Sequence, residues 1–178
     1  MTLPSLTLIL GAAASGKSAF AEKLVESQAE NRLYIATAEA QDGEMAEKIA
    51  AHRARRGAGW RTEEAPLDPA PALATAKARE VVLLDCATLW LANHIMAGSD
   101  PAAATEALEA ALAACPAPVV IVSNETGMGI VPESPLARRF RAAQGALNQR
   151  LAARAGLAVM VIAGLPLVLK GALPEAAS

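Results

Sequence analysis

One short segment near the N-terminus carries the residues best suited to chemistry. Residues 11–18 read Gly-Ala-Ala-Ala-Ser-Gly-Lys-Ser and lie between an apolar run and a helical stretch, which argues against a chance match in a turn of small residues. Its glycines let backbone amides approach phosphate groups, and the helix N-terminus adds positive partial charge. We expect Lys17 to reach the β- and γ-phosphates of a nucleoside triphosphate and Ser18 to bind Mg²⁺.

A carboxylate is expected where a second buried strand ends. Val81–Asp85 reads Val-Val-Leu-Leu-Asp. An ionised carboxylate after an apolar strand is costly unless it serves a cation or a hydrogen-bond partner. Together with the phosphate loop, this predicts that Asp85 joins Ser18 in binding Mg²⁺. The alternative is that Asp85 caps a helix that begins near Thr88.

His52 lies in an amphipathic helix predicted over residues 43–56, where it shares one face with Met45 and Ile49. Three basic residues follow it: Arg53, Arg55 and Arg56. A neutral imidazole among guanidiniums is able to attack phosphorus while the guanidiniums stabilise the developing charge. Spacing alone nevertheless favours a half-buried histidine on a charged helix. The other histidine, His94, is expected to be structural.

The segment after the fourth predicted strand is also rich in chemistry. In residues 123–133, Asn124 and Glu125 end the strand and two glycines follow. We expect the amide and the carboxylate to face the same crevice as Lys17, as a substrate-hydroxyl or metal site. The alternative is a glycine-rich turn that needs positive φ. Basic residues on the next helix are able to meet an anion, although such a run is more often a solvated face: Arg138, Arg139 and Arg141.

The elements that must position these residues follow from short apolar runs separated by helical stretches. Continuous apolar runs predict parallel strands buried on both faces. They cover Leu6–Leu10, Leu33–Ala36, Val81–Asp85, Val119–Asn124 and Val159–Ala163, with Leu167–Leu169 as a short edge strand. Helices are expected over 16–29, over 43–56, from Pro101 to about Cys115, and from Pro135 to before Gly156; residues 65–71 are expected to form a loop. Asp100 and Ser134 precede prolines and are predicted N-caps. The alternation predicts a doubly wound α/β fold, a mainly parallel sheet flanked by helices, with ligands at the carboxyl ends of the strands.

Composition limits the classes of function. The 178 residues suit a single domain over 1–178, and 53% of them are hydrophobic. A net charge of −2, from 16 basic and 18 acidic residues, argues against nucleic-acid binding. No apolar run reaches the roughly 18 residues of a membrane span. Cys86 and Cys115 have no metal-ligand spacing and are expected to be free thiols in a reducing cytoplasm.

Several motifs together resemble one enzyme family. Beyond the phosphate loop they are Leu33–Ala38, the helix with Glu44, Met45, Ile49, His52 and Arg53, the run Trp60–Glu64, the stretch Leu84–Asn93, the block Ser123–Glu133, and the residues Leu136–Arg141 and Asn148–Leu151. Along nearly the whole chain, from Leu8 to about Lys170, the sequence resembles the bifunctional adenosylcobinamide kinase / adenosylcobinamide-phosphate guanylyltransferase family of cobalamin biosynthesis. The block Ser123–Glu133 and the helix with Met45 and His52 are far more specific than the phosphate loop.

The resemblance implies a P-loop NTPase-type fold and two reactions. ATP or GTP phosphorylates the aminopropanol hydroxyl of adenosylcobinamide, and GMP then moves from GTP to that phosphate through a guanylylated histidine, which matches His52. It implies a homo-oligomer. The implied nucleotide contacts are Gly11, Ala12, Ala13, Ala14, Ser15, Gly16, Lys17, Ser18, Ala36, Thr37, Ala38, Arg53, Ala54, Arg55, Arg56, Glu64 and Asp85. Ala12 and Ala14 stand where the family often has glycine and arginine, so any contact made by that arginine is in doubt.

Two other functions fit the phosphate loop. The first is a kinase with one activity, in which His52 has no chemical role. The second is a regulatory or assembly module that binds nucleotide without small-molecule chemistry. Labelling of the protein by α-labelled GTP separates the bifunctional enzyme from both, and cobinamide-dependent nucleotide consumption separates the kinase from the module.

Overall fold

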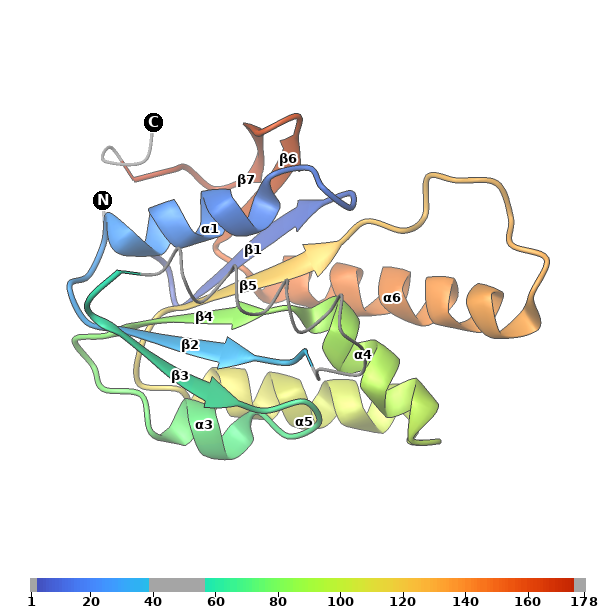
Figure 1. Ribbon diagram of the computed structural model, residues 1–178, viewed down its shortest axis with the longest axis horizontal. Helices are drawn as coiled ribbons and strands as arrows, with labels where there is room; N and C mark the ends of the chain where they lie inside the picture. Colours follow the sequence, from blue (N-terminus) through green and yellow to red (C-terminus); the bar gives the residue numbers. More distant parts are fainter. Residues whose placement is uncertain (1–2, 39–56, 175–178) are drawn as a thin grey trace.

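The computed structural model describes residues 3–38 and 57–174. Within these ranges, seven strands form one sheet in the order β3-β2-β4-β5-β1-β6-β7 (Figure 1). The strands are β1 Leu6–Gly11, β2 Arg32–Ala36, β3 Trp60–Glu64, β4 Val81–Asp85, β5 Val119–Asn124, β6 Leu157–Ile162 and β7 Leu165–Lys170. β7 runs antiparallel to β6, and the other neighbouring strands are parallel. The predicted mainly parallel sheet is confirmed.

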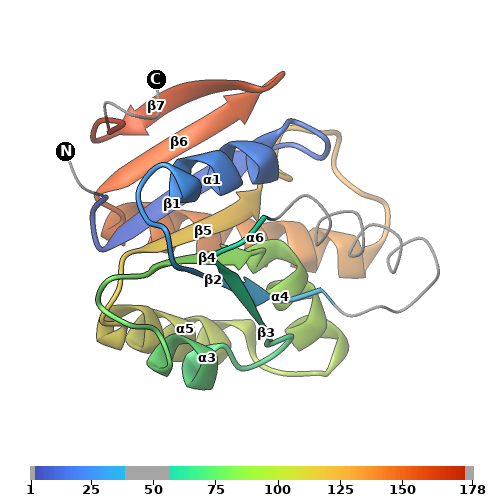
Figure 2. The ribbon, with the colours of Figure 1, turned by 60° about the vertical axis from the view of Figure 1, so that its left-hand side comes forward.

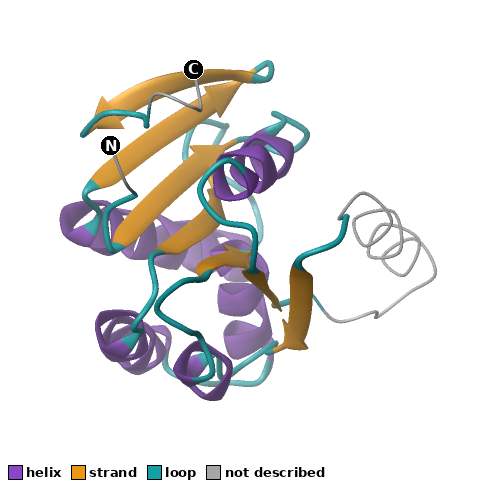
Figure 3. Ribbon diagram, turned by 90° about the vertical axis from the view of Figure 1, so that its left-hand side faces the viewer, coloured by secondary structure: helices purple, strands orange, loops and turns teal. Residues whose placement is uncertain are grey.

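Helices cover both faces of this sheet. They are α1 Lys17–Glu26, α3 Ala70–Ala74, α4 Ala87–Met96, α5 Pro101–Ala114 and α6 Pro135–Arg154. α1 packs on one face, and the other four pack on the opposite face (Figures 2 and 3). The predicted doubly wound arrangement is therefore confirmed. Among the helices of the described ranges, none has the length and apolar character needed to cross a membrane.

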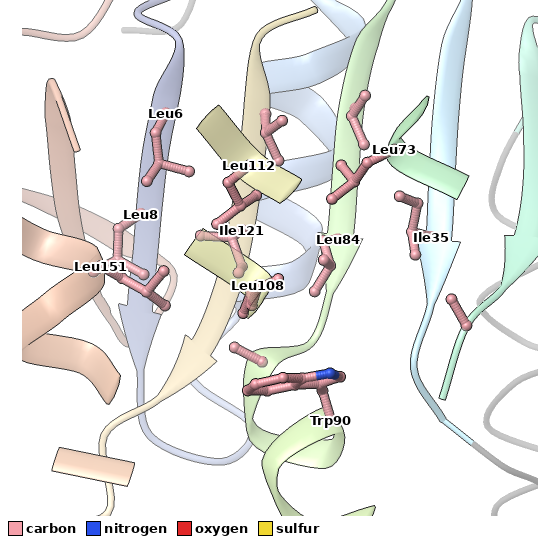
Figure 4. Packing of buried hydrophobic residues seen from close by; sticks show 14 of the residues in the cluster. Leu6, Leu8, Ile35, Leu73, Leu84, Trp90, Leu108, Leu112, Ile121 and Leu151 are labelled. Atoms are coloured by element: carbon pink, nitrogen blue, oxygen red, sulfur yellow. The ribbon is translucent and has the colours of Figure 1, made fainter. Parts of the chain in front are cut away.

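The core forms because side chains of each strand alternate between the two faces. In β1, Ile9 packs with the side chains of α1, whereas Leu8 faces α5 and α6. Figure 4 shows Leu8 beside Ile121 of β5, with α5 and α6 side chains packed over these strands. The indole of Trp90 is 1% exposed and donates from Nε1 to a backbone carbonyl at 2.8 Å, so burial leaves its N–H satisfied.

The two proline-marked helix starts are confirmed. Asp100 accepts a hydrogen bond from the Ala102 amide at 3.0 Å, and Pro101 is the first residue of α5. Ser134 accepts from the Ala137 amide at 3.4 Å at the start of α6. These side chains satisfy amides that have no partner within the first turn.

Three features of the sheet and its connections differ from the sequence prediction. β3 was not predicted, because Trp60–Glu64 is polar and lies exposed or half-buried at the sheet edge, without an apolar run. β7 is longer than Leu167–Leu169 and pairs through a tight turn with β6. The stretch 65–71 is not wholly a loop, since α3 begins at Ala70. The helix predicted over 43–56 lies outside the described residues.

The register brings the predicted site residues to one edge of the sheet. Ala36 lies opposite both Glu64 of β3 and Asp85 of β4. Gly11, where the phosphate loop begins, lies opposite Asn124 of β5. All of these residues end parallel strands, so the carboxyl edge of the sheet gathers residues that are up to about 110 positions apart in the sequence.

Candidate functional site

The phosphate loop joins β1 to α1 and depends on its two glycines. A Cβ atom on Gly11 would lie 2.8 Å from the carbonyl oxygen of Val161, which is backbone and has little room to move. Gly16 has a φ of 91°, in the left-handed region that favours glycine. A Cβ there would lie 3.2 Å from the Cα of Gly164 in the β6–β7 turn. The close approach of this turn fixes the shape of the loop.

Hydrogen bonds hold the same loop internally. The Lys17 ammonium donates to the Ala12 carbonyl at 3.1 Å, and the Ser15 amide donates to the same oxygen at 3.2 Å. The Gly164 amide donates to the Ser15 carbonyl at 2.8 Å. The side chains of residues 12–14 are exposed, so replacing glycine or arginine by alanine at Ala12 and Ala14 leaves this backbone bonding in place.

Asp85 ends β4 near the phosphate loop, and its surroundings decide between its two predicted roles. The helix-cap alternative is wrong, because the N-cap of α4 is Cys86, whose Sγ accepts from the Leu89 amide. The Asp85 carboxylate instead accepts a hydrogen bond from the Tyr34 hydroxyl at 3.2 Å. This bond orients a carboxylate at the carboxyl edge of the sheet.

The pKa of the Cys86 thiol responds to two nearby charges, those of Asp85 and Lys17. Burial and, to a lesser extent, the Asp85 carboxylate raise the pKa of this thiol, the Lys17 ammonium lowers it, and the result is a pKa of about 11. Both charges therefore act on one buried sulfur atom. The thiol stays protonated at neutral pH and serves as a cap and packing group, in agreement with the expected free cysteine.

The donor set fits Mg²⁺ held together with a nucleotide. Ser18 lies in the first turn of α1 beside Lys17, and Asp85 supplies a carboxylate that Tyr34 orients through a hydrogen bond to Oδ2. Within residues 3–38 and 57–174, no cluster of three or more His, Cys, Asp or Glu side chains could hold a metal alone. Mg²⁺ needs no such cluster, because it commonly takes one or two protein oxygens, phosphate oxygens and waters.

Thr37, an implied nucleotide contact, is fully buried between the ends of β2 and β4. Its hydroxyl donates to the Cys86 carbonyl and accepts from the Cys86 amide, both at 2.8 Å. The Asn93 amide group donates to the Thr37 carbonyl at 2.9 Å and to the Pro66 carbonyl at 3.0 Å. The sequence analysis did not predict this role of Asn93. A polar residue on the otherwise apolar helix α4 could have indicated a buried hydrogen bond. The buried Thr37 side chain thus shapes the backbone that carries Ala36 and Ala38.

Of the remaining implied contacts, one lies among the described residues and the others lie outside them. Glu64 ends β3 in register with Ala36, at the exposed edge of the sheet. The predicted nucleophile His52 lies outside the described residues, as do the contacts Arg53, Ala54, Arg55 and Arg56. Their roles stay predictions.

Asn124 and Glu125 lie directly beside the phosphate loop, because the Glu125 amide donates to the Gly11 carbonyl at 3.1 Å. The Asn124 backbone is fixed from two sides, by the Thr88 hydroxyl at 2.7 Å and by the Asn148 amide group at 3.0 Å. Its side-chain Oδ1 is buried and has no hydrogen-bond partner among the described residues. Such an atom is costly unless a ligand satisfies it.

Arg138 and Arg139 are exposed on α6 and Arg141 is half-buried, in line with a solvated face, and two of the three also bind backbone carbonyls. Arg138 donates to the Pro132 carbonyl at 2.9 Å. Arg141 donates to the Ile130 carbonyl at 3.1 Å and also to that of Gly127. The glycine-rich loop after β5 is therefore held against α6. The Glu125 carboxylate accepts from the Gly127 amide, which closes the first turn of the loop.

Comparison with a solved structure agrees with the fold. An ATPase from the type III secretion system of pathogenic bacteria superimposes with a TM-score of 0.54 at 10% identity. The match covers 92% of this chain and 56% of that chain. At this identity the likeness shows the fold alone.

Comparison of sequences is far more specific. The bifunctional adenosylcobalamin biosynthesis protein CobP of Pseudomonas aeruginosa is 47% identical over 168 residues, covering 92% of this chain and 96% of that protein. The proteins named CobU of Escherichia coli and Salmonella typhimurium are 41% and 42% identical, each covering 93% of this chain and 99% of its own length. The model of the family described as cobinamide kinase / cobinamide phosphate guanyltransferase matches residues 7–169, so the chain belongs to that family.

Proposed function

We propose that this chain phosphorylates the hydroxyl of adenosylcobinamide with ATP or GTP and then transfers GMP from GTP to the new phosphate. Pyrophosphate and adenosyl-GDP-cobinamide are the products of the second step. The observation that carries the proposal is the braced phosphate loop, residues 11–18, beside Asp85 and Asn124 at one sheet edge. Membership of the cobinamide kinase family supplies the acceptor.

In the first reaction the substrate hydroxyl oxygen forms a bond to the γ-phosphorus as the bond to the β–γ bridging oxygen breaks. The nucleoside diphosphate leaves, and the hydroxyl proton passes to solvent. Lys17 and the amides of the phosphate loop stabilise the negative charge of the transferring group. Ser18 and Asp85 would hold Mg²⁺ together with the triphosphate, and the ion would supply positive charge to the phosphate oxygens. The unpaired Oδ1 of Asn124 accepts a hydrogen bond from the substrate hydroxyl and orients it.

In the second reaction the His52 imidazole forms a bond to the α-phosphorus of GTP, and pyrophosphate leaves. A phosphate oxygen of adenosylcobinamide phosphate then attacks the same phosphorus, which breaks the phosphorus–nitrogen bond and frees His52. Arg53, Arg55 and Arg56 favour the neutral imidazole and stabilise the leaving group. The sequence pattern and the family resemblance support this role for His52.

We further propose that the chain acts as a homo-oligomer in the cytoplasm. The free thiols of Cys86 and Cys115 suit a reducing compartment. The β6–β7 hairpin exposes large apolar side chains, which suits contact with another copy: Ile162, Leu165, Leu167 and Leu169. Sedimentation of the purified protein tests this, and a monomer at micromolar concentration would contradict it.

One assay with two labels tests the proposed reactions. γ-Labelled ATP or GTP should transfer its label to cobinamide, and α-labelled GTP should transfer GMP to cobinamide phosphate. Transfer of the γ-label alone would support the single-activity kinase. Binding of nucleotide without transfer of either label would support the regulatory module.

A further inference from the structure

The loop between β5 and α6, together with the first turn of α6, exposes four large apolar side chains. They form what we call the apolar loop patch: Met128, Ile130, Val131 and Leu136, with exposed fractions of 83%, 96%, 67% and 51%. Single exposed apolar residues are ordinary, but four within nine positions gather apolar surface on one segment, as segments that bind a partner or ligand do.

This patch is presented by a held backbone. Arg141 donates to the carbonyls of Ile130 and Gly127, and Arg138 donates to that of Pro132 at 2.9 Å. These bonds occupy the polar groups of the loop on the side of α6. A surface held in this way loses less conformational freedom when a ligand binds than a loose loop would.

The segment that carries the patch begins beside the phosphate loop. Glu125, at the start of the segment, donates its amide hydrogen to the Gly11 carbonyl at 3.1 Å. The segment then leaves the carboxyl end of β5 and returns to α6 (Figure 1). The segment therefore begins beside the phosphate loop, at Asn124 and Glu125, and carries the patch outward from that edge of the sheet (Figure 1).

We propose that the apolar loop patch binds the corrin macrocycle of cobinamide, so that the hydroxyl arm of the substrate reaches the phosphate loop. This inference rests on the proposed function. The corrin ring has methyl-bearing apolar faces and is too large to share the phosphate cradle with a nucleotide. It needs an apolar surface outside that cradle, within reach of its hydroxyl arm, and the patch is an apolar surface on the segment that begins beside the cradle.

A second copy of the chain is the other candidate occupant. It has a better surface in the β6–β7 hairpin, where large side chains on an edge strand are exposed, among them Leu165 and Leu167. The patch differs from the hairpin because it follows the strand that carries Asn124. Its position therefore favours the substrate.

The test compares the double variant Met128→Ser/Ile130→Ser with Met96→Ser. Met96 is 76% exposed at the end of α4 and is not part of the patch, so it is a matched control. Binding of cobinamide is measured by equilibrium dialysis and corrin absorbance, and binding of labelled GTP is measured separately. Thermal melting and sedimentation check the fold and the oligomeric state.

We expect the double variant to bind cobinamide about tenfold or more weakly, since it loses the burial of two large apolar side chains. Its affinity for GTP should equal that of the wild type, and Met96→Ser should bind both ligands normally. Unchanged cobinamide affinity, or an altered oligomeric state, in the double variant would overturn the inference. If the wild-type protein neither binds nor phosphorylates cobinamide, the proposed function fails, and the inference fails with it.

Discussion

Lys17 Nζ lies 3.1 Å from the Ala12 carbonyl, within the loop that is proposed to hold the phosphates. The side chain can exchange this neutral acceptor for a phosphate oxygen, which forms a stronger, charge-assisted bond. The Asp85 carboxylate, at the end of β4, is oriented by a hydrogen bond from the Tyr34 hydroxyl. The Lys17 ammonium and the Asp85 carboxylate therefore carry opposite charges, and single substitutions can separate their roles toward phosphate and metal.

Lys17→Ala should lower kcat/KM of both reactions by about 10²-fold or more, because each reaction needs the triphosphate aligned and its charge stabilised. Steady-state kinetics with each label measures this. Lys23→Ala is the control, since Lys23 is exposed in the last turn of the same helix. Rates equal to wild type in Lys17→Ala would remove the phosphate loop from the account.

Asp85→Asn should keep the fold but raise the Mg²⁺ concentration for half-maximal kinase activity about tenfold, because an amide oxygen is a poorer ligand for a hard cation. A Mg²⁺ titration at saturating ATP measures the shift. Asp100→Asn, which changes an exposed helix cap to another good cap, should leave the titration unchanged. If both variants titrate like the wild type, Asp85 does not serve the metal.

At the scale of elements, an ion-pair cluster joins α5 to α6. Glu109 is 3% exposed and accepts hydrogen bonds from Arg150 at 2.9 Å and from Arg154 at 3.1 Å. The hydrogen bonds from Arg150 lower the pKa of Glu109, against the effect of its burial, and Arg154 lowers it further. A carboxyl whose pKa is lower in the folded state stabilises the fold above its unfolded pKa of about 4.3. That stability is lost as the pH falls through the folded pKa.

Glu109→Gln should therefore lower the free energy of unfolding by about 2 kcal/mol at pH 7. Its stability should also fall less steeply than that of the wild type below about pH 4.3. Some slope should remain, because Arg61 lowers the pKa of Glu80 in the same way. Urea unfolding at several pH values measures both effects. Glu106→Gln is the control, and we expect less than about 0.5 kcal/mol from it, because its side chain is 71% exposed. Equal losses in the two variants would contradict the role of Glu109.

The elements also show which parts of the fold the sequence can predict. Val81–Asp85 and Val119–Asn124 were predicted with the observed bounds, because an apolar run and its end are local signals. β3 has no such signal. It exists because β2 offers it a partner edge, and this pairing places Glu64 beside Ala36.

The candidate site divides in the same way. The position of Lys17 follows from a motif and that of Asp85 from the end of an apolar run, and both signals lie within a few consecutive residues. The bonds from Asn93 to Thr37, and from Asn148 to the Asn124 backbone, join residues 56 and 24 positions apart. They depend on how α4 and α6 pack on the sheet. No local pattern states that packing, although polar residues on an apolar helix indicate that such bonds exist.

At the scale of the whole molecule, one sheet edge must serve two reactions. The phosphate loop, Asp85 and the strand end at Asn124 meet at this edge. Phosphorylation of cobinamide needs only the γ-phosphate aligned with its acceptor. Transfer of GMP additionally needs a nucleophile at the α-phosphorus, which the sequence assigns to His52. The two reactions should therefore be separable by one substitution.

The measurement that tests this most directly is labelling of the protein by α-labelled GTP in His52→Ala, followed by denaturation. We expect His52→Ala to lose the label and GMP transfer while it keeps much of its kinase activity. The control His94→Gln replaces the other histidine, which lies on α4 with its Nε2 hydrogen-bonded to the Leu67 carbonyl, and it should be labelled like the wild type. Retention of the label in His52→Ala, or loss of both activities in a folded protein, would contradict the account.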